Sequence, residues 1–363
     1  MIISLFSLIL WGYIILIVLT IIGWNKNKMV SNNENHNFVS VIIPFRNEES
    51  NLRTTIESVL KNNTTQFELI LIDDHSEDSS LTIALSFQEK FKNVSVFKLT
   101  NTTGKKAAIK LGVEQARAEL ILQTDADCVV QNTWVSSMAC EFKNETKLLI
   151  GPVKVAKTNE YWNWFNQLEF GFLQAFTAAA ANFNNPIMAN GANLMYLKET
   201  YWEFEQSKLG DEYASGDDQF LLNHVKSHHP NDIKYVKKQE SIVSTVFSSD
   251  WKEMVKQRSR WAKKKSTSKG IEVFIGLVLL SSQFLLPVSL IFSLFESEFI
   301  NLFWTIFILK VVFEFALVSV FMSFFKLKGL KHVPLFTIVY PFFLTKVILL
   351  VKNSNNQWKG REI

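Results

Sequence analysis

The sequence predicts an α/β domain with a mainly parallel sheet, together with membrane-spanning helices at both ends of the chain. Strand-like apolar segments alternate with amphipathic, helix-like segments early in residues 31–249, and this pattern favours βαβ units. One long apolar run precedes that region and three follow it. The composition agrees, because 48% hydrophobic residues are too many for an ordinary soluble protein and 20% charged residues are too many for membrane helices alone.

The first apolar run lies within residues 1–24, carries no charge and is long enough to cross a bilayer. It has no basic leader and no Ala-x-Ala-type cleavage site, so we expect an uncleaved anchor. Lys26 and Lys28 follow it and predict that the next domain lies in the cytoplasm. Two cysteines, Cys128 and Cys140, are too few for a disulfide framework and fit that reducing compartment.

Four strands and three helices are expected in order after the anchor. The expected strands are 39–44, 67–72, 94–99 and 120–123, and the expected helices are 48–61, 80–92 and 105–118. In βαβ units the carboxyl ends of the strands lie at one edge of the sheet, where ligands bind. A proline and five acidic residues fall at those ends and predict one acidic crevice. They are Pro44, Glu48, Asp73, Asp74, Asp125 and Asp127.

The pattern changes after Asp127. Residues 161–181 are rich in aromatic residues and alanine, and we interpret them as a core helix, with a surface that cradles a lipid as the alternative. Residues 190–196 predict a strand with a glycine near its start, and residues 217–225 predict a further helix.

Residues 271–351 hold three further apolar runs. These runs are 273–295, 299–325 and 333–351. Glu296 and Glu298 lie between the first two, and the basic residues of 326–332 lie between the last two. Because positively charged loops stay in the cytoplasm, we expect the acidic loop on the outside.

The last run, 333–351, allows two topologies. A plain crossing would place the basic tail, residues 352–363, on the outside, against the charge rule. A re-entrant hairpin that bends at Pro341 would return the tail to the cytoplasm. The sequence leaves both alternatives open.

Asp125-Ala126-Asp127 ends a predicted strand. Two carboxylates at this spacing can hold a hard divalent cation, with diphosphate oxygens as the remaining ligands. Aspartate is also common in turns, so a plain turn is the alternative. Asp73 and Asp74, at a neighbouring strand end, favour the metal and nucleotide interpretation.

Asp217 and Asp218 begin a predicted helix, where they suit the positive end of the helix dipole. A carboxylate at this place could also act as a general base toward the hydroxyl of a sugar acceptor. We favour the base role for Asp218, beside its capping role.

Residues 250–270 predict a basic amphipathic helix at the membrane face, with eight Lys or Arg and one Glu between positions 252 and 269. Binding to anionic lipid headgroups explains such charge, including Lys263, Lys264 and Lys265. It does not explain the Gln-x-x-Arg-Trp motif of residues 257–261, which offers a planar fork for phosphate and an aromatic face for stacking.

Lysines at two other positions also allow two interpretations each. Lys105 follows Gly104 and either reaches a phosphate or is a solvated helix start. Lys310 and Glu314 lie four residues apart within an apolar run, where we favour a neutralising pair over a transport role.

Taken in order, these motifs resemble those of membrane-bound family 2 glycosyltransferases with a GT-A fold, the group that contains cellulose and chitin synthases and ceramide glucosyltransferase. The resemblance covers roughly residues 38–262, and it is specific as an ordered set although each motif alone is not. The motifs are residues 39–48, 72–76, 104–112, 125–127, 191–193, 217–218 and 257–261.

The resemblance implies an inverting transferase that uses a nucleotide sugar, expected to be a UDP-sugar, with Mg²⁺ or Mn²⁺. By position, Asp74 would contact the base, Asp125 the nucleotide and Asp127 the metal. Asp218 would be the catalytic base, although this chain has Gly-Asp-Asp where the family has Thr-Glu-Asp. The implied donor-binding residues are Pro44, Glu48, Asp74, Lys105, Asp125, Gln257, Arg260 and Trp261, and the implied acceptor region is Gly191, Ala192, Asn193 and Asp217.

We therefore expect transfer of one or a few sugars to a lipid-embedded acceptor, since three C-terminal runs are too few for a polymer channel. A processive β-polysaccharide synthase subunit is the alternative enzyme, and a non-catalytic membrane scaffold is the alternative from another class. The expected partners are the donor, the lipid acceptor and the bilayer, with no nucleic acid. The expected location is a bacterial inner membrane, with the catalytic domain in the cytoplasm.

Overall fold

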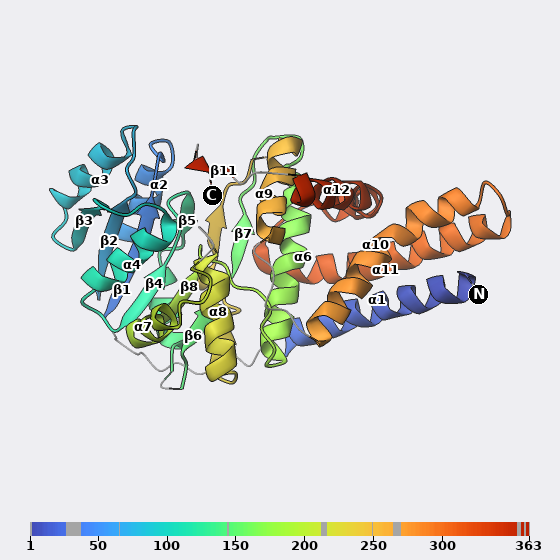
Figure 1. Ribbon diagram of the computed structural model, residues 1–363, viewed down its shortest axis with the longest axis horizontal. Helices are drawn as coiled ribbons and strands as arrows, with labels where there is room; N and C mark the ends of the chain where they lie inside the picture. Colours follow the sequence, from blue (N-terminus) through green and yellow to red (C-terminus); the bar gives the residue numbers. More distant parts are fainter. Residues whose placement is uncertain are drawn as a thin grey trace. The chain divides into compact units, whose positions relative to one another are not determined.

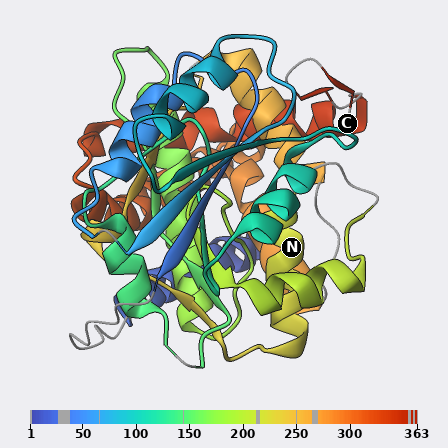
Figure 2. The same cartoon turned by 90° about the vertical axis from the view of Figure 1, so that its left-hand side faces the viewer.

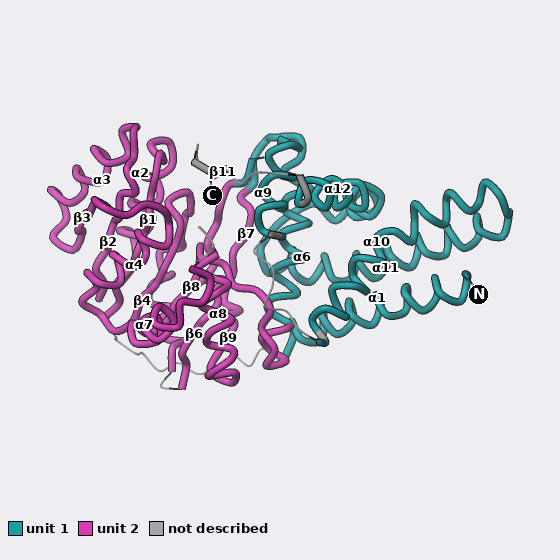
Figure 3. The backbone as a smooth tube through the Cα atoms, in the orientation of Figure 1, with its two compact units in different colours: residues 1–26, 157–179, 247–354 teal, residues 27–156, 180–246, 355–363 magenta. Residues whose placement is uncertain are grey.

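The computed structural model describes most of the chain, in two compact units. The described residues are 2–26, 38–64, 66–143, 145–211, 216–248, 250–263, 270–353, 357–358 and 361–362. The helical unit comprises residues 1–26, 157–179 and 247–354, and the sheet unit comprises residues 27–156, 180–246 and 355–363 (Figure 3). Lys28, one of the two lysines expected to mark the cytoplasmic side, lies outside the described residues.

A seven-stranded sheet forms the core of the sheet unit, in the order β3-β2-β1-β4-β8-β6-β9 (Figures 1 and 2). Its strands are β1 (Val39–Phe45), β2 (Phe67–Asp73), β3 (Val94–Lys98), β4 (Leu120–Gln123), β6 (Leu148–Ile150), β8 (Leu194–Leu197) and β9 (Ile233–Tyr235). Strands β1 to β4 pair in parallel, as do β6 and β9, whereas β8 runs antiparallel to both of its neighbours. The predicted mainly parallel sheet is confirmed.

The helices of the sheet unit follow the strands as expected for βαβ units. They are α2 (Leu52–Leu60), α3 (Ser80–Gln88), α4 (Lys105–Gln115), α5 (Trp134–Glu141), α7 (Lys198–Ser207), α8 (Asp217–His228) and the 3-10 helix η1 (Gln239–Ser241). Helix α8 extends beyond its predicted end at residue 225, to His228. The helices predicted over 48–61, 80–92 and 105–118 are in the right places but too long. The first begins late because the Asn51 N–H bonds back to the Glu48 carbonyl at 3.0 Å in a turn. The third ends early because Ala116 is extended.

Two small sheets were not predicted. Strands β5 (Cys128–Val130), β10 (Val243–Thr245) and β7 (Val153–Val155) form a three-stranded sheet, and β11 (Gln357–Trp358) pairs with β12 (Arg361–Glu362). Strands of two or three residues are too short for their alternation to be recognised in a sequence.

The helical unit contains three helices that pack against one another and others that lie across them. Its helices are α1 (Ile2–Asn25), most of α6 (Asn163–Asn182), α9 (Trp251–Lys263), α10 (Ile271–Phe292), α11 (Glu298–Phe325), η2 (Leu330–His332) and α12 (Val333–Asn353). Helices α1, α10 and α11 pack together. Within the described residues, four segments are long and apolar enough to cross a membrane: these three helices and the segment of η2 and α12.

The last apolar run forms one continuous helix, α12, which includes Pro341. The run therefore does not turn back on itself, and the hairpin alternative is wrong. Within this helix the Thr345 hydroxyl donates to the Pro341 carbonyl at 2.8 Å.

The core-helix interpretation of residues 161–181 is confirmed by α6. Phe165 and Phe170 are buried, and the Phe165 ring lies 5.2 Å from Phe336 and 5.0 Å from Phe343 of α12, between ring centroids. Gly171 permits close approach to α11, because a Cβ there would lie 2.3 Å from the Phe321 ring.

A buried polar cluster joins three of the apolar helices. The expected pairing of Lys310 with Glu314 is confirmed, with 3.2 Å between Nζ and Oε1. The same carboxylate accepts from the Tyr13 hydroxyl of α1 at 2.7 Å and from the Thr337 hydroxyl of α12 at 2.5 Å. The ion pair and these two hydrogen bonds compensate the buried charges of Lys310 and Glu314 inside the helical unit.

Gly151 makes room for a buried polar contact in the sheet unit. The Asn193 side chain is fully buried, accepts from the Trp134 indole N–H at 3.0 Å, and donates to the carbonyls of Pro152 at 3.0 Å and Ser241 at 2.8 Å. A Cβ at Gly151 would lie 2.2–2.4 Å from the atoms of this amide. Position 151 therefore requires glycine, because the Asn193 amide lies too close for any larger side chain.

We expect Gly151→Ala to lower the free energy of unfolding by about 1–3 kcal/mol, because the added methyl group must push the Asn193 amide off its partners. Thermal unfolding in detergent, followed by circular dichroism, measures the change. Gly276→Ala is the matched control, since its Cβ would meet nothing within 4 Å. Equal melting temperatures for the two variants would contradict the prediction.

Candidate active site

The Asp-Ala-Asp motif forms the turn between β4 and β5. The Thr124 N–H donates to the Ile42 carbonyl of β1 at 3.2 Å, and the Cys128 N–H donates back to the Asp125 carbonyl at 3.2 Å. The Thr55 hydroxyl of α2 donates to the Ala126 carbonyl at 2.7 Å. The turn is thus fixed from both sides, which leaves both aspartates half-buried at the carboxyl end of β4.

Carboxylates crowd around this turn. Burial, together with the negative charges of Asp125 and Glu48, raises the pKa of Asp127 to about 6. The Cys128 thiol donates to Asp127 Oδ1 at 3.5 Å. Three acidic residues from two loops therefore share one region, as the strand-end argument predicted for Glu48, Asp125 and Asp127.

Lys105, the first residue of α4, supplies the positive charge of this region. Its Nζ lies 2.6 Å from Asp125 Oδ1. Burial alone would lower the pKa of Lys105, but the charges of Asp125, Asp217 and Asp218 outweigh burial and raise it above its ordinary value. The alternative of a solvated helix start is therefore wrong for this side chain.

Antiparallel pairing brings the predicted acceptor region to the same place. Gln123, at the end of β4, lies opposite Leu194, at the start of β8, so the residues before Leu194 flank the Asp-Ala-Asp turn. The Thr124 hydroxyl donates to the Ala192 carbonyl at 2.8 Å. The Gly191 N–H donates to Asp218 Oδ2 at 3.0 Å.

Gly191 also has a packing role. A Cβ at Gly191 would lie 3.0 Å from Gln123 Nε2, 3.3 Å from Lys105 Nζ and 3.7 Å from Asp218 Cβ. The glycine thus lies at the point where the side chains of three elements, β4, α4 and α8, converge.

Asp217 and Asp218 occupy the first turn of α8, as predicted. Asp217 is buried, and its carboxylate accepts a hydrogen bond from the Gln123 side-chain N–H at 3.5 Å. The Gln123 side-chain oxygen in turn accepts a hydrogen bond from the Tyr196 hydroxyl at 3.2 Å. No motif marks Gln123 or Tyr196 as a site residue, because each belongs to an ordinary strand pattern.

The other residues expected at the crevice hold its loops. The Asp74 carboxylate accepts from the Gly104 N–H at 3.1 Å, and the Asp73 carboxylate accepts from the Ser76 N–H at 3.0 Å. Pro44 pairs with Ile72 of β2, beyond the last residue of β1 that pairs with β4. Asp74 lies beside the loop that carries Lys105, whereas Asn193 points into the core through the bonds described above.

The Gln-x-x-Arg-Trp motif lies on α9, in the helical unit. Gln257, Arg260 and Trp261 are half-buried, and burial lowers the pKa of Arg260 below its ordinary value. The side chains of Lys263, Lys264 and Lys265 lie outside the described residues.

Arg258, inside this motif but not predicted, is its anchor. The Arg258 guanidinium is buried and donates to the carboxylate of Glu169, from Nε at 3.0 Å to both oxygens and from Nη2 at 2.6 Å. It also donates to the Gln257 side-chain oxygen and lies 4.3 Å from the centre of the Trp261 ring. One buried ion pair therefore orients two motif residues. The pairing of Glu169 with Arg258 could not be found from spacing, since the two residues lie far apart in the chain.

The acidic turn supplies some of the ligands that a divalent cation needs. No group of three or more His, Cys, Asp or Glu side chains among the described residues is arranged as a complete metal site. Asp125 and Asp127 offer two carboxylates. Burial raises the pKa of Asp127, the charges of Asp125 and Glu48 add to this effect, and a cation beside the carboxylates would oppose both. Such a pair suits Mg²⁺ or Mn²⁺ that takes its other ligands from a diphosphate and water.

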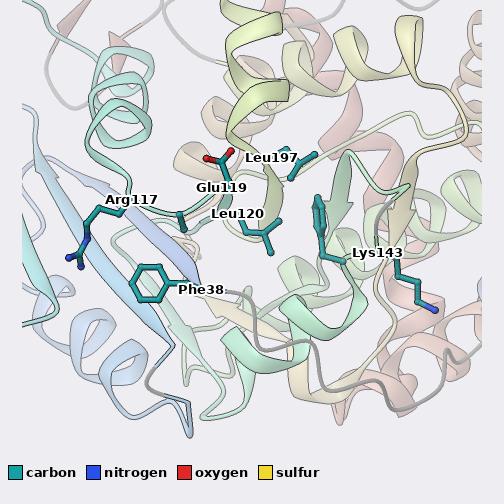
Figure 4. A pocket seen from close by; sticks show the side chains of 8 residues that line it. Phe38, Arg117, Glu119, Leu120, Lys143 and Leu197 are labelled. Carbon is teal, nitrogen blue, oxygen red and sulfur yellow. The ribbon is translucent and has the colours of Figure 1, made fainter.

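A pocket of about 520 Å³ lies elsewhere, at the amino end of β4 (Figure 4). It is lined by Phe38, Leu120 and Leu197 among others, and Arg117 at its edge is paired with Glu68 at 2.7 Å. The acidic turn lies at the opposite end of the same strand, so this pocket is separate from the candidate site.

The raised pKa of Asp127 predicts a pH-dependent stability. The folded protein binds this proton more tightly than the unfolded chain, so the metal-free protein should lose stability as pH rises from about 4 to about 6. Melting temperatures in EDTA across this range, compared with those of Asp127→Asn, isolate the effect. Identical pH profiles would show that Asp127 titrates normally.

The Arg258–Glu169 pair predicts a specific pattern of stabilities. Glu169→Met or Arg258→Met alone leaves a buried charge without its partner and should cost about 3–5 kcal/mol. The double variant removes both charges and should cost less than either single variant. Thermal unfolding of the four proteins completes the cycle, and simple additivity would contradict the assignment.

Comparison with known proteins agrees with this geometry. Residues 40–204 match the model of the family described as glycosyl transferase family 2. The chain is 34% identical over 99 residues to a dolichyl-phosphate beta-glucosyltransferase of Mus musculus, covering 24% of this chain and 31% of that protein. It is 40% identical over 93 residues to an undecaprenyl-phosphate 4-deoxy-4-formamido-L-arabinose transferase of Photorhabdus laumondii, covering 24% and 29%. The chain thus matches about a third of the length of these curated relatives.

Solved structures give a comparison over nearly the whole chain. A mannosyltransferase from Pyrobaculum calidifontis, in complex with GDP-Man and Mn²⁺, aligns with a TM-score of 0.56 and 11% identity over 97% of this chain and 100% of that one. At this identity the likeness shows the fold. Residues 40–204 therefore match a glycosyl transferase family 2 domain, and the chain has the GT-A fold.

Proposed function

We propose that this protein is an inverting glycosyltransferase that moves a sugar from a nucleotide-sugar donor, a UDP-sugar, to a lipid-embedded acceptor at the cytoplasmic face of a membrane. The observation that carries the proposal is the convergence of Lys105, Asp125, Asp127 and Asp218 at one edge of a family 2 domain. The site is built from separate loops, as a transfer site between two substrates requires.

Asp218 is the proposed catalytic base. Its Oδ2 is held by the Gly191 N–H, which fixes the direction of the carboxylate. In that position it takes the proton from an acceptor hydroxyl, whose oxygen attacks the anomeric carbon as the bond to the diphosphate breaks. One displacement inverts the configuration, so an α-linked donor gives a β-glycoside.

Lys105 and the acidic turn are proposed to bind the diphosphate of the donor. Lys105 is close to Asp125 and carries the positive charge that phosphate oxygens need. Asp127, with Asp125 beside it, would hold Mg²⁺ or Mn²⁺, which supplies charge neutralisation for the departing diphosphate when bound. The presence of Mn²⁺ in the complex of the structurally similar mannosyltransferase supports this choice of metal.

The names of the relatives support a lipid phosphate as the acceptor. Both relatives described above are named for transfer to a polyprenyl phosphate, dolichyl or undecaprenyl. In the part of the chain that the structure describes, four segments are apolar enough to cross a membrane, which supports an integral membrane protein that meets such a lipid. We propose that Gln257, Arg260 and Trp261 also bind substrate groups at the membrane face.

The experiment is a product analysis with purified protein. We expect a single sugar on a polyprenyl phosphate when the protein receives a panel of UDP-sugars and GDP-mannose, with undecaprenyl phosphate, dolichyl phosphate or diacylglycerol as acceptor. EDTA should abolish the product and Mn²⁺ should restore it. The masses of the extracted lipids measure both effects. A ladder of long products would instead indicate a polysaccharide synthase, and no product with any pair would favour a scaffold.

The chemistry of the acceptor decides how much Asp218 contributes. A lipid hydroxyl must lose a proton, so Asp218→Asn should slow its glycosylation by about 10²–10⁴-fold. A phosphate monoester has a second pKa near 6 and is already ionised at pH 7, so the same change should slow its glycosylation less. Asp127→Ala should remove the Mn²⁺ dependence and most activity with either acceptor. Unchanged activity of both variants would rule out the proposed site.

A further inference from the structure

Lys105 lies close to carboxylates of two different elements. Its Nζ lies 2.6 Å from Asp125 Oδ1 in the acidic turn. The same atom lies 3.3 Å from the position that a Cβ at Gly191 would take, and the Cβ of Asp218 lies 3.7 Å from that position. The ammonium group is therefore bonded to the acidic turn and also lies near the first turn of α8.

The end of the Lys105 side chain can move while its root stays in place. Lys105 is 24% exposed and Asp125 is 32% exposed, so their ion pair borders solvent, and the lysine has a flexible four-carbon stem. The backbone before it is fixed, because the Gly104 N–H donates to the Asp74 carboxylate at 3.1 Å. The Gly104 carbonyl accepts from the Ala108 N–H at 3.1 Å, which starts α4.

The Asp125 carboxylate is claimed by two positive charges. The divalent cation of the proposed function would be held by Asp127 with Asp125 beside it, yet Asp125 is already paired with Lys105. An ammonium group and a divalent cation repel each other strongly at short distance. A cation that enters the acidic turn must therefore compete with Lys105 for Asp125.

The diphosphate of a donor offers Lys105 a different partner. Phosphate oxygens accept charge-assisted hydrogen bonds from ammonium groups, and these bonds are stronger than those between neutral groups. A diphosphate next to the acidic turn lies within reach of the mobile end of Lys105. Once the ammonium group turns to the diphosphate, Asp125 is released.

We propose that Lys105 is a built-in competitor of the divalent cation, which pairs with Asp125 in the donor-free protein and leaves it when a diphosphate binds. The ammonium group keeps the affinity for the cation low until the donor arrives. The donor then raises that affinity by drawing Lys105 away, so that the two ligands favour each other's binding through one side chain. The inference rests on the donor and metal sites of the proposed function and adds a coupling between them.

The neighbouring lysine provides a matched control. Lys106 Nζ donates to the Gly210 carbonyl at 2.9 Å and lies 3.6 Å from Asp211 Oδ1. Its side chain is thus held by another loop and not by the acidic turn. Lys106→Met removes one positive charge from the same helix end as Lys105→Met does, but it leaves the pair of Lys105 with Asp125 intact.

Mn²⁺ binding to the purified protein in detergent, without nucleotide, tests the inference. The paramagnetic resonance signal of free Mn²⁺ measures the dissociation constant. We expect Lys105→Met to bind Mn²⁺ about ten-fold or more tightly than the wild type, because the competing charge is gone. Lys105→Arg keeps the charge and should resemble the wild type, as should Lys106→Met. Asp127→Ala in the Lys105→Met background should abolish the gain, which would locate it at the acidic turn.

UDP binding should change in the opposite direction. Calorimetry at saturating Mn²⁺ should show that Lys105→Met binds UDP about ten-fold or more weakly, because the diphosphate loses a charge-assisted hydrogen bond. A variant with a damaged fold would bind both ligands more weakly, so only competition predicts opposite signs. Unchanged UDP affinity would overturn the inference, since the diphosphate would then not take Lys105 from Asp125.

The inference and the proposed metal site fail in different ways. If Asp127→Ala changes Mn²⁺ binding in neither the wild-type nor the Lys105→Met background, the metal site of the proposed function is wrong and the inference falls with it. If Asp127→Ala weakens Mn²⁺ binding but Lys105→Met does not strengthen it, only the inference is wrong.

Discussion

The antiparallel pairing of β8 with β4 is the constraint on which the candidate site depends. Parallel strands alone would bring together only loops that leave the carboxyl ends of β1, β2 and β4. Because β8 runs the other way, the residues that enter it reach the same edge. Gly191 and Ala192 therefore meet the Asp-Ala-Asp turn, and the Gly191 N–H connects that turn to the first turn of α8.

Charge balance explains the rest of the site's construction. Asp125, Asp127 and Glu48 repel one another, and Lys105 pairs with Asp125. Such crowding destabilises a domain that has no other use for it. Uncharged partners, such as the Thr55 and Thr124 hydroxyls, fix the backbone of the turn without reducing that charge. The fold thus maintains a negative region whose stability depends on what binds there.

Sequence patterns predicted the elements whose periodicity is long and the residues at strand ends. The first four strands, the core helix α6 and the acidic turn belong to this group. Residues whose role depends on a distant partner could not be predicted. Arg258 was one basic residue among eight, and its burial against Glu169 depends on the packing of α6 with α9. Gln123 looked like an ordinary strand residue, and Asn193 was expected in the acceptor region and not in the core. The hydrogen bonds of these two side chains are visible only once distant segments are folded together.

The hydrogen bond from Tyr13 to Glu314 has a consequence for how the chain is made. The two residues are 301 positions apart. At a synthesis rate of about 5–20 residues per second, α1 waits roughly 15–60 s before its acceptor exists. Lys310, one helical turn before Glu314, can neutralise that carboxylate as soon as α11 emerges, so the charge is never without a partner. The first helix to be synthesised is therefore among the last to be secured, and closure of the helical unit reports that the chain has been completed at least through α11.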